Sequence, residues 1–78
     1  MDEKLIAAFE KNNTEQVRLY LTEFQGRPMI DLRVWAETQD GTWIRTRKGI
    51  TMSADLIGNL KAVVDEAEGK IGAEIGTA

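Results

Sequence analysis

The residues best suited to chemistry in this chain are cations and aromatic rings, many of them spaced two apart. The segment RTRKGITMS, Arg45 to Ser53, carries three cations within four residues, although the whole chain has 10 Lys+Arg against 13 Asp+Glu. Such cations bind phosphates or carboxylates, and a glycine beside them lets backbone N–H groups approach the same anion. The alternative is a solubilising strand edge, since lysine and arginine discourage edge-to-edge aggregation.

These cations and rings lie in segments where apolar and polar side chains alternate, which is the pattern of a half-buried β-strand. The segments are bounded by residues that turns prefer, such as glycine, proline and aspartate. Residues 1–11 fit either a first strand or a frayed arm. We therefore predict an antiparallel sheet over residues 15–52. The alternating segments are 16–24, 29–38 and 42–47, and the turn signals lie at 25–28 and 39–41.

A helix is predicted after the sheet, over residues 53–68. Apolar side chains recur there from Leu56 to Ala67 with the three- and four-residue spacing of one helix face. Ser53 suits the N-cap position, and Gly69 suits the residue that ends a helix. The tail over 70–78 is rich in glycine and alanine, so we expect it to be irregular.

The element order predicts an α+β fold in a single domain, 1–78, with a meander of three or four antiparallel strands followed by one C-terminal helix. The helix is expected to cover one face of the sheet and to leave the other for water, a second subunit or a ligand. A chain of 78 residues is marginal alone, and this one has neither Cys nor His to form a disulfide or the usual metal sites. We therefore expect a homodimer with Leu60, Val63 and Val64 at its interface, and no metal or cofactor.

The sheet face opposite the apolar strand residues carries most of the rings and arginines. Four of the five aromatic residues and four of the five arginines belong to it. Rings and guanidinium planes stack on unpaired bases, at about 1–3 kcal/mol per base, while cations contact phosphates. Aromatic residues also favour strands for structural reasons alone, but an exposed patch of this composition favours single-stranded nucleic acid. The face consists of Arg18, Tyr20, Thr22, Phe24, Asp31, Arg33, Trp35, Trp43, Arg45 and Arg47.

Two other classes of function compete with nucleic-acid binding. An enzyme is disfavoured, because without His or Cys only carboxylates remain for catalysis, and Asp31 and Asp40 lack a paired spacing; no small-molecule substrate is expected. The stronger alternative is a protein-interaction module that uses the exposed rings and arginines as hot spots. The longest apolar run has five residues, Leu5 to Phe9, so we expect no membrane contact and a cytoplasmic protein, nucleoid-associated if bacterial.

Three motifs, in order along the chain, give the sequence a family resemblance. They are FQGR (Phe24–Arg27), MIDLRVW (Met29–Trp35) and RKGITMS (Arg47–Ser53). Together they resemble the transcriptional coactivator positive cofactor four and its bacterial and phage single-stranded-DNA-binding relatives. The resemblance runs from about Val17 to Ala67. It implies four strands followed by a helix, a homodimer formed through the helix region, and DNA bound on the curved sheet face.

Carried over by position, the resemblance implies contacts to nucleic acid from both rings and cations. The chain departs from the eukaryotic member at Ala36, which stands in place of a stacking tryptophan. We predict sequence-tolerant binding of single-stranded DNA, in transcription or DNA metabolism, with RNA left open. The nucleic-acid contacts that the resemblance implies are Phe24, Arg27, Arg33, Arg47 and Lys48, and Trp35 matches an aromatic residue of bacterial members. Strand parity adds four further predicted contacts, Arg18, Tyr20, Trp43 and Arg45.

Overall fold

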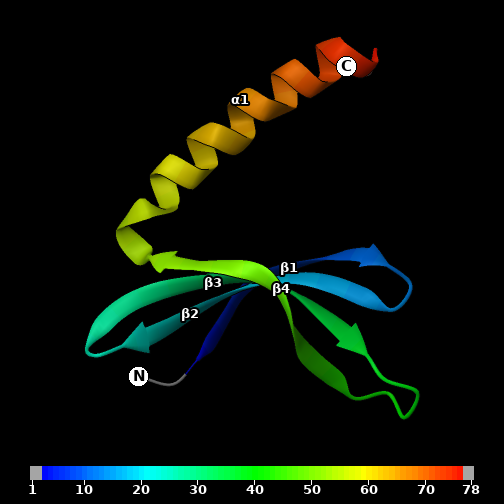
Figure 1. Cartoon of the computed structure of the whole chain (residues 1–78), viewed down its shortest axis with the longest axis vertical. Coiled ribbons are helices and arrows are strands. Elements are labelled where there is room, and N and C mark those ends of the chain that lie inside the picture. The colour runs from blue at the N-terminus through cyan, green and yellow to red at the C-terminus, as the bar shows by residue number, and fades with distance from the viewer. Residues whose placement is uncertain (1–2, 77–78) are drawn as a thin grey trace.

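The computed structural model describes residues 3–76 and confirms four antiparallel strands followed by one C-terminal helix (Figure 1). Residues 1–11 had two interpretations, and Lys4 to Asn12 form a strand. A short 3₁₀ turn, η1, links the last strand to the helix. The elements are β1 Lys4–Asn12, β2 Glu15–Phe24, β3 Arg27–Glu37, β4 Trp43–Ser53, η1 Ala54–Leu56 and α1 Ile57–Ile75.

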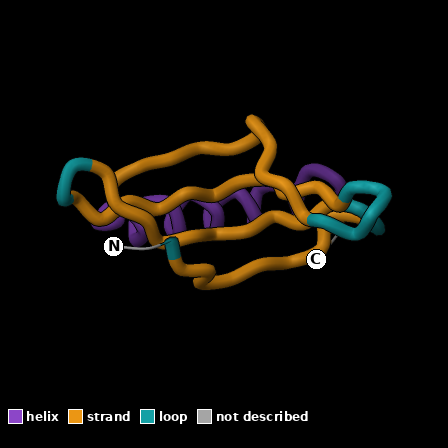
Figure 2. The backbone as a smooth tube through the Cα atoms, turned by 90° about the horizontal axis from the view of Figure 1, so that it is seen from below, coloured by secondary structure: helices purple, strands orange, loops and turns teal. Residues whose placement is uncertain are grey.

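The sheet is a meander in which every strand pairs with the next strand along the chain, in the order β1-β2-β3-β4. Seen from below, the four strands lie side by side (Figure 2). The β2–β3 hairpin closes through Gln25 and Gly26, whose φ angles are 50° and 80°. Positive φ at both central residues is the geometry of the tightest hairpin turns, so the turn predicted at 25–28 is confirmed.

Strand β4 bends sharply where its pairing with β3 is interrupted (Figure 1). Trp35 pairs with Arg45 and Arg33 pairs with Gly49, so a bulge in β4 lies opposite Val34. At Gly49 the backbones meet closely, because a Cβ there would lie 2.5 Å from the Leu32 carbonyl oxygen and 2.7 Å from the Arg33 Cα. Only glycine fits this position without a shift of the backbone.

The two faces of the sheet follow from the register. Leu19, Leu32 and Ile50 face one another across β2, β3 and β4, so the apolar side chains share one face. Ile30 is the buried hydrophobic residue of the described chain, with 5% of its surface exposed. Most of the remaining apolar face is half-buried or exposed, so no element within residues 3–76 covers this face.

The expectation that the helix covers one face of the sheet is wrong. Helix α1 rises away from the strands (Figure 1), and its substantial contacts are with η1, which in turn touches β3. The radius of gyration is 14.7 Å, against about 11–12 Å for a compact domain of this length. The accessible surface is 6079 Å², against about 4,700 Å² for a compact monomer of this mass.

The helix boundaries also differ from those predicted. The predicted range was 53–68, whereas α1 spans Ile57–Ile75, so most of the segment expected to be irregular, 70–78, is helical; residues 77–78 lie outside the described part. Gly76 ends the helix with φ 73°, in the role predicted for Gly69. Ser53 precedes the 3₁₀ turn and makes no side-chain cap hydrogen bond. Glu66 and Lys70, four residues apart on either side of Gly69, form a 3.6 Å ion pair on this part of the helix.

The close approach at Gly49 predicts the effect of a single methyl group. Gly49→Ala should lower the free energy of unfolding by about 2–3 kcal/mol. The added Cβ would overlap with the Leu32 carbonyl oxygen, and the overlap can be relieved only by moving the β3 backbone. Gly69→Ala is the matched control: nothing lies within 4 Å of its Cβ position, and alanine favours the helix by about 0.5–1 kcal/mol. Urea unfolding at one protein concentration measures both, and equal midpoints for the two variants would contradict the close contact.

Candidate nucleic-acid interface

The register brings the predicted rings and arginines onto one face of the sheet. Cross-strand partners share a face, and the pairs Arg18–Arg33, Tyr20–Asp31 and Trp35–Arg45 join β2, β3 and β4. Trp43 pairs with Glu37 at the far end of the same face. We call this surface the polar face, and its central members are Arg18, Tyr20, Asp31, Arg33, Trp35, Trp43 and Arg45.

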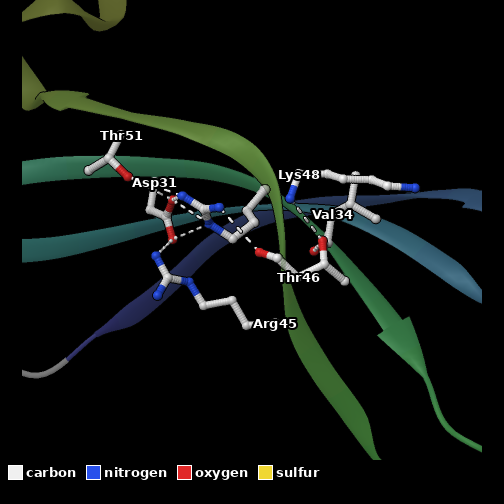
Figure 3. Close-up of polar contacts among 7 residues, drawn as sticks. Asp31, Val34, Arg45, Thr46, Lys48 and Thr51 are labelled. Atoms are coloured by element: carbon white, nitrogen blue, oxygen red, sulfur yellow. Dashed lines mark hydrogen bonds and ion pairs between the residues drawn. The ribbon is translucent and has the colours of Figure 1, made fainter.

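Asp31 is the buried centre of the polar face, with 3% of its surface exposed. Its Oδ1 lies 2.9 Å from Nη2 of Arg33 and accepts a 3.1 Å hydrogen bond from Thr51. Its Oδ2 lies 3.0 Å from Nη2 of Arg45 (Figure 3). One carboxylate therefore ties two arginines on neighbouring strands, because the pleat points all three side chains to the same side.

The pKa of Asp31 reflects two opposed effects. Burial alone raises the pKa of a carboxyl group, but hydrogen bonds from Arg33 and Thr51, together with the charges of Arg33 and Arg45, outweigh it. The net result is a pKa below the usual value. Asp31 is therefore ionised at neutral pH and fixes both guanidinium groups.

Arg33 is occupied by contacts within the sheet. Besides Asp31, it donates from Nη1 to the Thr46 carbonyl oxygen at 3.2 Å and from Nη2 to Thr51 Oγ1 at 3.3 Å. Its side chain is 12% exposed, whereas that of Arg45 is 50% exposed. Arg45 is thus the member of the pair that solvent or a ligand can reach.

Arg18 lies against both tryptophans of the chain. Its guanidinium carbon is 4.8 Å from the ring centroid of Trp35 and 5.2 Å from that of Trp43. Nε donates to Gln16 Oε1 at 2.9 Å and Nη1 to the Tyr20 hydroxyl at 3.3 Å, and both acceptors are neutral. Among the described residues, Arg18 therefore has cation–π contacts but no carboxylate partner.

The end of the β2–β3 hairpin presents a separate pair. Phe24 and Arg27 are cross-strand partners beside the turn, and 63% of the Phe24 surface is exposed. Arg27 is exposed and forms no ion pair with another described residue. The pair lies six residues along β2 from Arg18, which is about 20 Å in a strand.

The bulge in β4 divides the basic cluster Arg45–Lys48. Arg47 is exposed and forms no ion pair among the described residues. The Lys48 side chain extends away from Asp31 and Arg45 (Figure 3) and lines a hollow of about 280 Å³ with Val17, Val34 and Ile50 of the apolar face. The structure therefore does not bring Lys48 together with the polar face.

Sequence reasoning missed three positioning groups. Thr46 donates from Oγ1 to the Val34 carbonyl at 2.7 Å and accepts from the Lys48 backbone at 3.2 Å, so it holds the bulge. Thr51 and Gln16 hold Asp31 and Arg18. Strand parity is the signal that would have placed Gln16 and Thr51 on the polar face, but no sequence signal reports the bulge contact of Thr46.

No group of three potential metal ligands is found in the described part of the chain, and no described helix is long and apolar enough to cross a membrane. The polar face carries rings, guanidinium groups and hydroxyls, which can stack on planar groups and bind anions.

Comparison with known proteins agrees with this architecture. Residues 11–63 match the family model described as Transcriptional Coactivator p15 (PC4). The chain belongs to the PC4 family. The match includes all ten residues predicted to contact nucleic acid and ends at Val63, so the distal half of α1 lies outside it. No curated protein matches the chain.

Two solved structures from the PC4 family resemble this chain. A PC4 homologue from Burkholderia pseudomallei superposes with a TM-score of 0.78 at 28% identity, covering 83% of this chain and 88% of that one. A bacteriophage T5 homologue, implicated in recombination-dependent DNA replication, gives a TM-score of 0.60 at 25% identity, covering 97% and 83%. The family resemblance seen in the sequence is thereby confirmed.

The buried carboxylate predicts a pH-dependent stability. Asp31→Asn keeps the shape but leaves Arg33 and Arg45 without a counter-ion, and should lower the free energy of unfolding at pH 7 by about 3 kcal/mol. Because the folded pKa of Asp31 is lowered, its contribution is present above the unfolded value of about 4 and is lost as pH falls through the folded value. Urea unfolding from pH 7 to pH 2 should show the two proteins converging.

Glu74→Gln is the control, since this exposed helix residue also loses one negative charge. It should unfold close to wild type at every pH. A constant difference between Asp31→Asn and wild type down to pH 2 would show that the carboxylate charge does not hold the polar face.

Proposed function

We propose that this chain binds single-stranded DNA on the polar face, without strong sequence preference, in transcription or in recombination-related DNA metabolism. Membership of the PC4 family supports a DNA-binding role, and the phage homologue is implicated in recombination-dependent replication. The observation that carries the proposal is the row of rings and arginines that β2, β3 and β4 assemble on one face. Such a row stacks on unpaired bases, which a duplex would hide.

The two ends of the polar face offer different contacts to the same strand. At the hairpin, Phe24 supplies an exposed ring for a base and Arg27 a cation for the adjacent phosphate. At the other end, Trp35, Trp43 and Arg18 form a cluster. The two ends lie about 20 Å apart, which several nucleotides of an extended DNA strand can span. One DNA molecule therefore contacts both ends of the polar face.

The exposed cations flank this path. Arg45 keeps half of its side chain exposed beside Asp31, and Arg47 follows it in β4. Lys48 reaches the other side of β4 at the sheet edge. It can contact a phosphate only if the DNA strand passes around that edge. Arg33 acts as a positioning residue, because Asp31, Thr46 and Thr51 occupy its guanidinium group.

Binding and its salt dependence test the proposal. Fluorescence anisotropy with labelled oligo-dT should show binding that weakens with salt, by about 0.7 per phosphate contact on a log–log plot. Phe24→Ala should lower the affinity roughly tenfold with an unchanged salt slope, because it removes stacking. Arg27→Ala should reduce the slope by about one contact.

Lys70→Ala is the matched control, because it removes one exposed cation from the distal helix, and it should bind as wild type does. Absence of binding at micromolar protein in low salt would overturn the proposal. A salt-independent interaction would instead favour a protein-interaction module. If Lys48→Ala leaves the slope unchanged, the DNA path stays on the polar face.

We also infer that two copies of the chain pair through α1. Val63 and Val64 are 62% and 56% exposed. Leu60 and Val63 line a hollow of about 280 Å³ with Met52, Leu56 and Asn59, next to the end of the sheet. The excess accessible surface over a compact monomer, roughly 1,300 Å², exceeds the roughly 800 Å² per partner of a standard interface. A second copy supplies the apolar cover that one chain lacks.

Light scattering tests the pairing. The wild-type chain of 8.7 kDa should have about twice that mass in solution. Val63→Glu should give a monomer or an unfolded chain, because it places a charge in an apolar contact. Ala62→Glu adds the same charge at the preceding residue, outside the apolar stripe, and should remain dimeric. A wild-type mass of one chain would refute the pairing.

A further inference from the structure

The cluster of Arg18, Trp35 and Trp43 has the form of a stacking site that is already filled. The guanidinium group is planar, and it lies within stacking range of two indole rings, at 4.8 and 5.2 Å from their centroids. Tyr20 extends the cluster, with its ring centroid 5.2 Å from that of Trp35. A nucleobase is also planar and makes its contacts with such rings through the same faces.

The contacts of Arg18 allow another planar group to replace its guanidinium group on the tryptophan rings. Arg33 and Arg45 are fixed by a buried carboxylate, whereas Arg18 is held by two neutral acceptors and by the rings. Its direct cross-strand partner is Arg33, whose charge Asp31 already balances. An incoming phosphate offers Arg18 an anionic partner, which lowers the cost of moving Arg18 outward.

A second observation concerns Trp35. Its Nε1 is buried and donates to no partner among the residues that the structure describes. Buried donors without an acceptor are uncommon and cost about 1–3 kcal/mol. The cluster is therefore incompletely satisfied in the free chain, and a nucleotide brings carbonyl and phosphate oxygens as acceptors.

We propose that a nucleobase exchanges with the Arg18 guanidinium group at the faces of Trp35 and Trp43, and that the displaced Arg18 pairs with a phosphate of the same strand. This inference rests on the proposed function and deepens it by assigning one base subsite. The exchange keeps both ring faces covered in the free and bound states, and it converts a cation held by neutral groups into an ion pair. It also couples stacking of one base to one additional phosphate contact.

Intrinsic fluorescence isolates this event, because Trp35 and Trp43 are the two tryptophans of the chain. The probes are oligo-dT and an abasic oligonucleotide of the same length and backbone charge, with binding measured in parallel by anisotropy of an end label. Oligo-dT should quench the tryptophan emission at saturation. The abasic strand should bind more weakly, through its phosphates, and leave the emission within about a tenth of its starting value.

Two variants separate stacking from charge. Arg18→Met removes the planar guanidinium group and its positive charge. Quenching by oligo-dT should persist, while the salt slope should fall by about one phosphate contact, 0.7 on the log–log plot. Trp43→Leu removes one ring and should weaken oligo-dT binding roughly tenfold, with binding of the abasic strand within twofold of wild type. Lys61→Met, which removes a cation from α1, should match wild type in both readouts.

The outcomes distinguish this inference from the proposed function. If neither oligonucleotide binds, both fail. If both bind and quench equally, or if Arg18→Met abolishes quenching in a protein whose circular dichroism matches wild type, the DNA-binding proposal stands and the exchange is refuted. The comparison of the two strands on the wild-type protein needs no variant, so it decides even if a variant does not fold.

Discussion

The structure depends on one buried carboxylate. Asp31 sits in a central strand with almost no exposed surface and holds Arg33 beside it and Arg45 on the next strand. A charge in that position must be compensated locally, so the positions of both guanidinium groups, and of Thr51, follow from it. Arg33 in turn reaches the Thr46 carbonyl and so secures the bulge in β4. The order of the polar face and the bend of the sheet therefore have the same origin.

The chain uses its few strong contacts on the polar face and leaves its apolar face open. Ile30 is nearly buried, while the helix stripe and much of the apolar face remain accessible. In a large domain the apolar layer supplies most of the stability, but here one copy has too little of it covered. Ion pairs, cation–π contacts and the backbone ladder fix the shape, and association completes the apolar layer in the assembly that we propose.

The sequence predicted local features better than long-range ones. Alternation placed Arg18, Trp35 and Arg45 on one face, because side-chain direction in a strand has a period of two and depends only on the neighbours. The turn signal at 25–28 predicted the hairpin, because such a turn requires positive φ and Gly26 tolerates it. The alternation did not show that Asp31 is buried, nor that the Arg45–Lys48 cluster is split, because the bulge depends on contact between two strands.

The helix was the least predictable element. Its apolar stripe has the same period whether it packs on its own sheet or on another molecule, so the pattern could not determine its direction. Its end was placed too early because a glycine can also lie inside a helix, at a cost of about 0.5–1 kcal/mol. Gly69 does so, whereas Gly76 adopts the left-handed conformation that ends the helix. The residues of the candidate site were largely predictable as a set. Which of its cations are held in ion pairs with Asp31 depends on distances between side chains, which the sequence does not give.

The meander order has a kinetic consequence. Every strand pairs with its neighbour along the chain, so each pairing closes a loop of a few residues and costs little chain entropy. Chains dominated by such short-range contacts fold faster than β-sheets that pair distant segments. The sheet, with its polar face, can thus assemble within one polypeptide before copies meet, and the encounter of two copies becomes a separate, concentration-dependent step.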